Sequence, residues 1–206
     1  MDGSPVRQKT YAVNEEEQSI EADGVEITIY GALTNLYCNE NQLTALDVSK
    51  NTALGYLECT YNQLTALDVS NNTALTEFYC NNNQLTALDV SNNTALTYLE
   101  CTDNQLTALD VSKNTALTWL KCDKNQLTAL DVSKNTSLTS FVCNDNPTIT
   151  TLSIASSYGN ASVSTALATL ITNATSTTGT LNIYGGDNTT VHTAATTKGW
   201  TVNTNL

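Results

Sequence analysis

Six cysteines divide the middle of this sequence into equal steps. Each lies 21 residues after the one before it, and the residues between them repeat almost unchanged. The positions are Cys38, Cys59, Cys80, Cys101, Cys122 and Cys143. A fixed period of this length is typical of stacked repeats, in which each unit buries its apolar face against its neighbours. The spacing therefore predicts a solenoid rather than a domain built around one compact core.

The apolar positions of each unit fit one coil of a leucine-rich repeat. The first full unit begins at Leu33, and the general form is L-x-x-L-x-C-x-x-N-Q-L-T-A-L-D-V-S-x-N-T-A. Asn35–Cys38 alternates between outward and inward positions as a strand does, so stacked units form one parallel sheet. We expect this sheet on the concave face. The convex side is expected to be mostly extended, because Leu46-Asp47-Val48 also alternates. The predicted fold is a leucine-rich repeat solenoid, a right-handed β-superhelix, with about six 21-residue units over residues 33–146.

Three repeated polar or sulfur-bearing positions have predicted structural roles. The cysteines are expected to be small buried thiols, because parallel side chains on neighbouring strands have poor disulfide geometry; disulfide pairing is the alternative. A ladder of buried asparagines is expected to satisfy backbone groups at turns; its members are Asn41, Asn62, Asn83, Asn104 and Asn125. An aspartate column is expected to accept hydrogen bonds from turn amides, with cation binding as the alternative; its members are Asp47, Asp68, Asp89, Asp110 and Asp131. No metal site is predicted, because the sequence has no C-x-x-C or Cys/His cluster.

Both ends of the chain depart from the repeat. Residues 1–18 are polar and are expected to be flexible, and residues 19–32 are expected to form a β-hairpin cap that turns at Asp23-Gly24. Residues 147–206 are expected to form a small α/β cap that shields the last core layer. Its predicted elements are strands over 150–154 and 180–184 and helices over 164–174 and 190–198, the second ended by Gly199.

The units resemble the internalin J-like subclass of bacterial leucine-rich repeats, which is frequent in surface proteins of Bacteroidetes. The resemblance rests on the 21-residue period, the cysteine column and sequence motifs such as Asn62-Gln-Leu-Thr-Ala-Leu-Asp-Val-Ser70. It covers about Leu33–Leu206. It implies an extracellular or cell-surface bacterial protein used in adhesion, biofilm growth or host contact. The N-terminal cap of known internalins is helical, whereas a hairpin is expected here.

Variation between the units concentrates in four positions around each cysteine. The first two are predicted to face outward from the concave sheet, and the other two to lie where the strand ends. Thr44, Ala45 and Asp47 are also expected to be exposed, yet their counterparts do not vary. We interpret the variable face as a recognition surface, because aromatic side chains give large contact area at low entropy cost; neutral drift is the alternative. The candidate partner-binding residues are Tyr37, Tyr56, Glu58, Tyr61, Glu77, Tyr79, Tyr98, Glu100, Asp103, Trp119, Lys121 and Asp123.

Charge narrows the class of partner. The chain has 20 acidic and 8 basic residues and a formal net charge of −12. This balance argues against binding to nucleic acids or anionic membranes, and no apolar run is long enough to insert into a membrane. An acidic, aromatic face favours a basic protein surface, or a sugar stacked on tyrosines. The expected partners are proteins or glycans on a host or bacterial cell surface.

Three functions remain open, and none needs a cofactor. The first is a non-enzymatic surface or secreted binding protein that recognises a protein through the concave face. The second is a carbohydrate-binding module of a glycan-uptake system. The third is a structural repeat array, including an ice-binding form suggested by a regular column of threonines: Thr44, Thr65, Thr86, Thr107 and Thr128. An enzyme is not expected, because the single histidine, His192, has no Asp/Ser constellation near it in the sequence.

Overall fold

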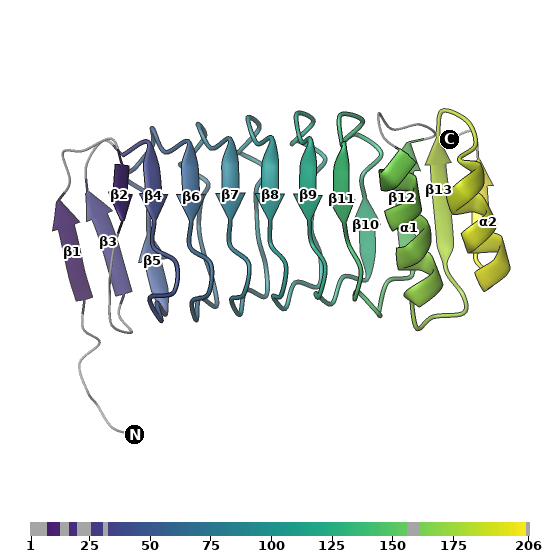
Figure 1. The fold of residues 1–206 in the computed structure, drawn as a ribbon, viewed down its shortest axis with the longest axis horizontal. Coiled ribbons are helices and arrows are strands. Elements are labelled where there is room, and N and C mark those ends of the chain that lie inside the picture. Colours follow the sequence, from purple (N-terminus) through teal and green to yellow (C-terminus); the bar gives the residue numbers. More distant parts are fainter. Residues whose placement is uncertain (1–7, 13–16, 20–25, 31–32, 156–160, 205–206) are drawn as a thin grey trace, which may run out of the picture.

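The computed structural model describes residues 8–12, 17–19, 26–30, 33–155 and 161–204. In Figure 1 the chain winds into a row of stacked coils, which confirms the predicted solenoid. Most coils send one strand to a seven-stranded sheet, with the order β11-β9-β8-β7-β6-β4-β2 and parallel pairing throughout. We call it the front sheet. Its strands are β2 (Glu17–Ser19), β4 (Asn35–Tyr37), β6 (Tyr56–Glu58), β7 (Glu77–Tyr79), β8 (Tyr98–Glu100), β9 (Trp119–Lys121) and β11 (Ser140–Val142).

The return limb of each repeat coil is extended, as predicted, and it forms named strands only at the two ends of the stack. At one end β5 (Ala45–Asp47) pairs with β3 (Glu26–Tyr30), which pairs with β1 (Gln8–Ala12). At the other end, four parallel strands form a sheet. They are β10 (Ala129–Asp131), β12 (Thr151–Ala155), β13 (Thr180–Tyr184) and β14 (Thr201–Thr204). Between β5 and β10 the return limbs contain no helix.

The N-terminal region differs from both of its predictions. Residues 8–12, expected to be flexible, form β1 and pair in parallel with β3. The predicted hairpin is wrong, because β2 pairs with β4 in the front sheet while β3 pairs with β5 on the return side. In a coil, consecutive strands alternate between two sheets, so a local turn signal does not make them neighbours. The predicted turn at Asp23-Gly24 lies outside the described residues.

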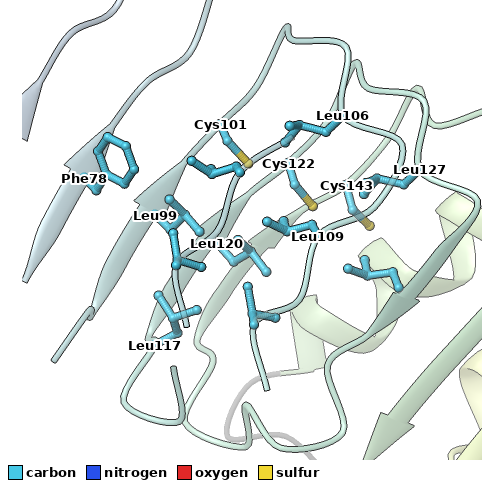
Figure 2. Close-up of a cluster of buried hydrophobic side chains, with 14 of the residues drawn as sticks. Phe78, Leu99, Cys101, Leu106, Leu109, Leu117, Leu120, Cys122, Leu127 and Cys143 are labelled. Atoms are coloured by element: carbon cyan, nitrogen blue, oxygen red, sulfur yellow. The ribbon is translucent and has the colours of Figure 1, made fainter. Parts of the chain in front are cut away.

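The core is a set of side-chain columns that continue from coil to coil. The middle residue of each three-residue front strand is buried while its two neighbours are half-buried, as strand alternation requires. Figure 2 shows Phe78, Leu99 and Leu120 in this cluster, with Cys101, Cys122 and Cys143 beside them. Large apolar side chains stacked on their counterparts stabilise each coil only when its neighbours are present.

All six cysteines are buried free thiols, which confirms their predicted role. The Cys59 thiol donates a weak hydrogen bond to the Tyr79 carbonyl in the next coil at 3.5 Å, and Cys101 does the same to Lys121. Burial raises the pKa of every one of these thiols, that of Cys38 to about 12. Because the thiolate is the reactive form, these cysteines are structural and chemically inert.

The predicted asparagine ladder joins neighbouring coils. Asn104 accepts from the Leu85 N–H at 3.0 Å and donates to the carbonyls of Cys80 and Cys101 at 3.1 Å each. One amide therefore satisfies backbone groups of two coils at once. Asn146 extends the ladder by one coil in the same way.

A second asparagine ladder was missed by sequence analysis. Its members are fully buried: Asn51, Asn72, Asn93, Asn114 and Asn135. Asn93, for example, donates to the carbonyls of Val69 and Asn72 at 3.0 and 2.9 Å. These residues sit in the S-x-N-T-A turn, where an asparagine is common for local reasons, and this hid their role between coils.

The C-terminal cap reverses the layout of the repeats. Its strands β12, β13 and β14 continue the return-side sheet, while the front position is taken by α1 (Ala161–Asn173) and α2 (Thr189–Lys198). The helix α1 packs against β11 and α2, and Figure 1 shows both helices closing the row. Both predicted helices are confirmed, and Gly199 ends α2 in the left-handed conformation at φ 87°. Within the described residues no helix is long and apolar enough to cross a membrane.

Candidate binding face

The outward side of the front sheet carries most of the candidate residues. We call this surface, made by the first and third residues of β4, β6, β7, β8 and β9, the front face. Its residues are Asn35, Tyr37, Tyr56, Glu58, Glu77, Tyr79, Tyr98, Glu100, Trp119 and Lys121. They are half-buried, as the predicted outward orientation and the contact between neighbouring columns require.

Five aromatic rings form a continuous ladder across five strands of the front face. Ring centroids lie 4.8 Å apart for Tyr37–Tyr56, 5.3 Å for Tyr56–Tyr79, 4.6 Å for Tyr79–Tyr98 and 5.3 Å for Tyr98–Trp119. The planes of neighbouring rings are 19–36° apart, so each inner ring has another ring on either side. Such contacts are worth about 0.5–1.5 kcal/mol per pair beyond burial, which makes the ladder a rigid surface.

Tyrosine and glutamate alternate on β6, β7 and β8 in two directions. Tyr56 lies opposite Glu77, and Glu77 lies opposite Tyr98. In the other column Glu58 lies opposite Tyr79, and Tyr79 opposite Glu100. We call this arrangement the Tyr–Glu checkerboard. On these three strands each ring contacts the next one diagonally, so the ladder passes from the first-residue column to the third-residue column and back. The glutamates occupy the positions of the two columns that the tyrosines leave.

Each tyrosine of the checkerboard is tied to the glutamate on its own strand. The hydroxyl of Tyr79 donates to Glu77 at 2.9 Å, and those of Tyr56 and Tyr98 donate to Glu58 and Glu100 at 3.0 Å. Burial, followed by these glutamates, raises the pKa of all three tyrosines. The hydroxyls therefore stay protonated and hold the carboxylates in place.

One cation of the chain itself is bound on this face. The Lys121 ammonium lies 3.3 Å from the Glu100 carboxylate and 5.5 Å from the centre of the Trp119 ring. An ammonium that meets a ring and a carboxylate together is favoured by both. Glu58 and Glu77 have no such cation, since no basic side chain of the described residues lies within 4.0 Å of either.

The remaining candidate residues lie where the front strands end. Tyr61 and Asp103 occupy a position that is left-handed in every repeat coil, with φ of 53° and 56°. Asp103 also lies 4.0 Å from Lys124, and Asp123 accepts from the Thr102 hydroxyl at 2.7 Å. The backbone thus restricts this column, because a left-handed φ suits asparagine and aspartate better than bulky residues.

The aspartate column has a local structural role. Each aspartate accepts from the backbone N–H of the serine two residues later at 2.9 Å, as for Asp68 and Ser70. This is the turn hydrogen bond that the sequence predicts. No three Asp, Glu, His or Cys side chains of the described residues are grouped to hold a metal ion.

His192 lies away from the front face, on α2. Its ring nitrogen Nδ1 is 2.8 Å from Asp187, and both side chains are exposed. A shallow hollow of about 320 Å³ on the same part of the cap is lined by Thr172, Thr190, Thr193, Ala194, Thr197 and Lys198. None of these lining side chains is a thiol or carboxylate.

Comparison with known proteins supports the fold. The family described as LVIVD repeat matches residues 78–101, and no curated protein matches the sequence. InlF, an internalin of Listeria monocytogenes, aligns over 89% of this chain and 54% of its own, with 22% identity and a TM-score of 0.54. The functional domain of InlJ from the same organism, which includes a cysteine ladder, aligns over 80% of this chain and 54% of its own, with 22% identity and a TM-score of 0.45.

This chain thus spans about half the length of both internalin structures. At 22% identity, the alignment with InlF shows a likeness of fold alone. In fold, the chain is an internalin-like repeat protein.

Proposed function

We propose that this chain is a non-enzymatic binding protein that recognises a protein partner through the front face, at a bacterial cell surface or after secretion. The observation that carries the proposal is the aromatic ladder from Tyr37 to Trp119. Rigid aromatic side chains with a polar tip are enriched at the energetic centres of protein interfaces. Adhesion, host contact or biofilm growth would each use such a surface.

The packing of the rings favours a protein over a glycan. A sugar stacks on an open ring face, but each inner ring of the ladder has a neighbouring ring on both sides. The ladder is thus a strip of packed rings whose hydroxyls donate to the carboxylates beside them. Such a strip suits a polypeptide, which brings apolar contacts and hydrogen-bond donors together.

Tyr61 supports the same proposal from the edge of the face. Its side chain is 58% exposed, and its backbone is left-handed at φ 53°. A bulky residue in that conformation costs about 1 kcal/mol, and the repeat imposes the conformation at this position in every coil. The conformation of Tyr61 therefore comes with the coil, and the exposure of its ring is what makes it available to a partner.

The decisive experiment is a binding screen of the full chain against arrays of extracellular proteins and glycans. The test variant is Tyr79→Ala/Tyr98→Ala/Trp119→Ala, and the matched control is Tyr184→Ala in the cap, where the tyrosine is 37% exposed. We expect a protein hit that the control keeps and the triple variant loses by at least about 100-fold, since hot-spot residues contribute about 2 kcal/mol or more each. Thermal unfolding of both variants checks the fold, and the single variant Tyr98→Ala serves if the triple variant unfolds.

Two results would contradict the proposal. One is a partner whose affinity the folded triple variant keeps in full, which would move the site elsewhere. The other is a glycan hit that soluble sugar competes away, which would favour the carbohydrate-binding alternative.

A further inference from the structure

We propose that the checkerboard of β6, β7 and β8 receives the arginine side chains of a basic segment in the partner protein. This inference rests on the proposed function and names the chemistry of its partner. Glu58, Glu77 and Glu100 are half-buried on the front face.

Two of these carboxylates lack a counter-charge. The Tyr56 and Tyr79 hydroxyls donate to Glu58 and Glu77, but no basic side chain of the described residues lies within 4.0 Å of either. A partly desolvated carboxylate without a cation is unfavourable in the free protein. A partner that supplies the cation recovers this cost, so the arrangement favours binding over stability.

Lys121 shows the mode of binding within the chain. Its ammonium contacts Glu100 at 3.3 Å and lies 5.5 Å from the centre of the Trp119 ring. The combination of a carboxylate with a neighbouring ring recurs around Glu58 and Glu77, and there no lysine of the described residues lies within 4.0 Å of the carboxylate. A cation of the partner protein can therefore bind at β6 and β7 in the way that Lys121 binds at β8 and β9.

Arginine fits these places better than lysine. Its planar guanidinium pairs with a carboxylate through two parallel hydrogen bonds, and the same plane packs against an aromatic ring. Glu58 and Glu77 stand on neighbouring strands and two residues apart in register, so they are about 8 Å from each other across the face. An extended peptide places alternate side chains about 7 Å apart, within reach of both glutamates through the long arginine arms.

The test uses the full chain and short peptides in which arginine, lysine or neutral citrulline alternates with serine. Calorimetry measures the affinity at low salt and again at about 0.15 M ionic strength, where screening weakens exposed charge pairs. We expect the arginine peptide to bind more tightly than the lysine peptide, and the citrulline peptide to bind at least about tenfold more weakly than either.

The test variant is Glu58→Gln/Glu77→Gln/Glu100→Gln, which keeps the shape of the face. The control is Asp68→Asn/Asp89→Asn/Asp110→Asn on the return limbs, which changes the net charge by the same amount. We expect the glutamine variant to lose at least about tenfold in affinity for the arginine peptide and the control to lose less than about threefold. The glutamine variant should also unfold at the same or a higher temperature than the parent, which a purely structural role for the glutamates would not produce.

The variant Lys121→Gln provides an independent test. Removing the internal cation frees Glu100 and the Trp119 ring, so we expect the arginine peptide to bind about twofold to fivefold more tightly. Lys113→Gln on the return side removes the same charge and should have a smaller effect.

The inference is overturned if the citrulline peptide binds as well as the arginine peptide, if the glutamine variant and the control lose equally, or if no arginine peptide binds at about 1 mM. If a partner protein depends on Tyr79, Tyr98 and Trp119 but not on the glutamates, this inference fails and the proposed function stands. If that partner depends on neither set, both fail.

Discussion

The repeat stack and the C-terminal cap bury their cores in opposite ways. In the stack, regular strands lie in front and the return limbs are held by turns, buried amides and aspartate hydrogen bonds. In the cap, the regular strands β12, β13 and β14 lie on the return side, and α1 and α2 cover the front. The front sheet therefore ends at β11 against α1, so its last strand is covered rather than left as an open edge.

This difference explains why the front face is confined to the repeats. A strand places every second side chain outward in register with the next coil, so a column of variable residues becomes a continuous surface. A helix in the same position breaks the columns. The stack is thus suited to present a long surface, and the cap is suited to end it.

The largest expected loss of stability comes from removing a buried asparagine of the stack, and we compare it with removal of an asparagine in the cap. Asn104→Ala leaves the buried N–H of Leu85 without a partner and removes one of the two amide donors from the carbonyls of Cys80 and Cys101, so we expect a loss of about 2–3 kcal/mol in the free energy of unfolding. Asn188→Ala removes the N-cap of α2, where the side chain accepts from Val191 at 3.4 Å, and should cost about 1 kcal/mol. Urea unfolding measures both, and a larger loss for Asn188→Ala would mean that amides do not tie the coils together.

Substitution of one glycine in each region gives the next largest expected change in the free energy of unfolding. The change is a loss in the cap and a gain in the stack. In the cap, a Cβ on Gly179 would lie 2.5 Å from the Trp200 ring and 2.7 Å from the Thr150 carbonyl. Gly179→Ala should therefore cost about 1–3 kcal/mol through overpacking.

Gly55 occupies a position where Thr76, Thr97 and Thr118 stand in later coils, and each of these hydroxyls donates to a carbonyl of the preceding coil. A Cβ on Gly55 would meet no atom closer than 3.7 Å. Gly55→Thr should extend this threonine ladder and stabilise the protein by about 0.5–1 kcal/mol. Thermal unfolding of the two variants checks the signs, and destabilisation by Gly55→Thr would show that the ladder does not reach this coil.

A smaller contribution to the free energy of unfolding depends on pH, and it comes from aspartates of the stack. Hydrogen bonds from the serine two residues later lower the pKa of Asp47, Asp68, Asp89 and Asp110. A carboxylate whose pKa is lower in the folded state stabilises that state above about pH 3.9, and this contribution is lost as pH falls through the folded pKa. The cap has one acidic residue, Asp187.

We therefore expect the unfolding temperature to fall as the pH is lowered below about 4. The fall should be smaller in Asp68→Asn/Asp89→Asn. In this variant the amide oxygen keeps the turn hydrogen bond, but the side chain does not titrate. Identical curves for parent and variant would show that these aspartates do not couple folding to pH.

The stack was predictable because its signals repeat. The 21-residue step placed the front strands, the buried cysteines and the first asparagine ladder, since each unit confirms the assignment of the others. The cap helices were also predictable, the first from the apolar face of Val163, Leu167 and Leu170 and the second from Gly199 at its end, although α1 begins at Ala161 rather than at residue 164.

The failures have a common physical origin. A coil brings together residues that are one repeat apart, and local signals do not report such contacts. Asp-Gly predicted a hairpin, but β2 and β3 belong to different sheets. The tyrosines were found as two separate columns, and only the stacked register shows that they form one diagonal ladder with glutamates between the rings.

The most direct test of the front face is hydroxyl-radical footprinting of the full chain with and without a partner from the binding screen. The oxidation of Tyr56, Tyr79, Tyr98 and Trp119 reports on the stack, and that of Tyr184 reports on the cap in the same sample. We predict that the partner protects the ladder residues and leaves Tyr184 unchanged. Protection of Tyr184 with no change at the ladder would contradict the assignment of the binding surface to the front face.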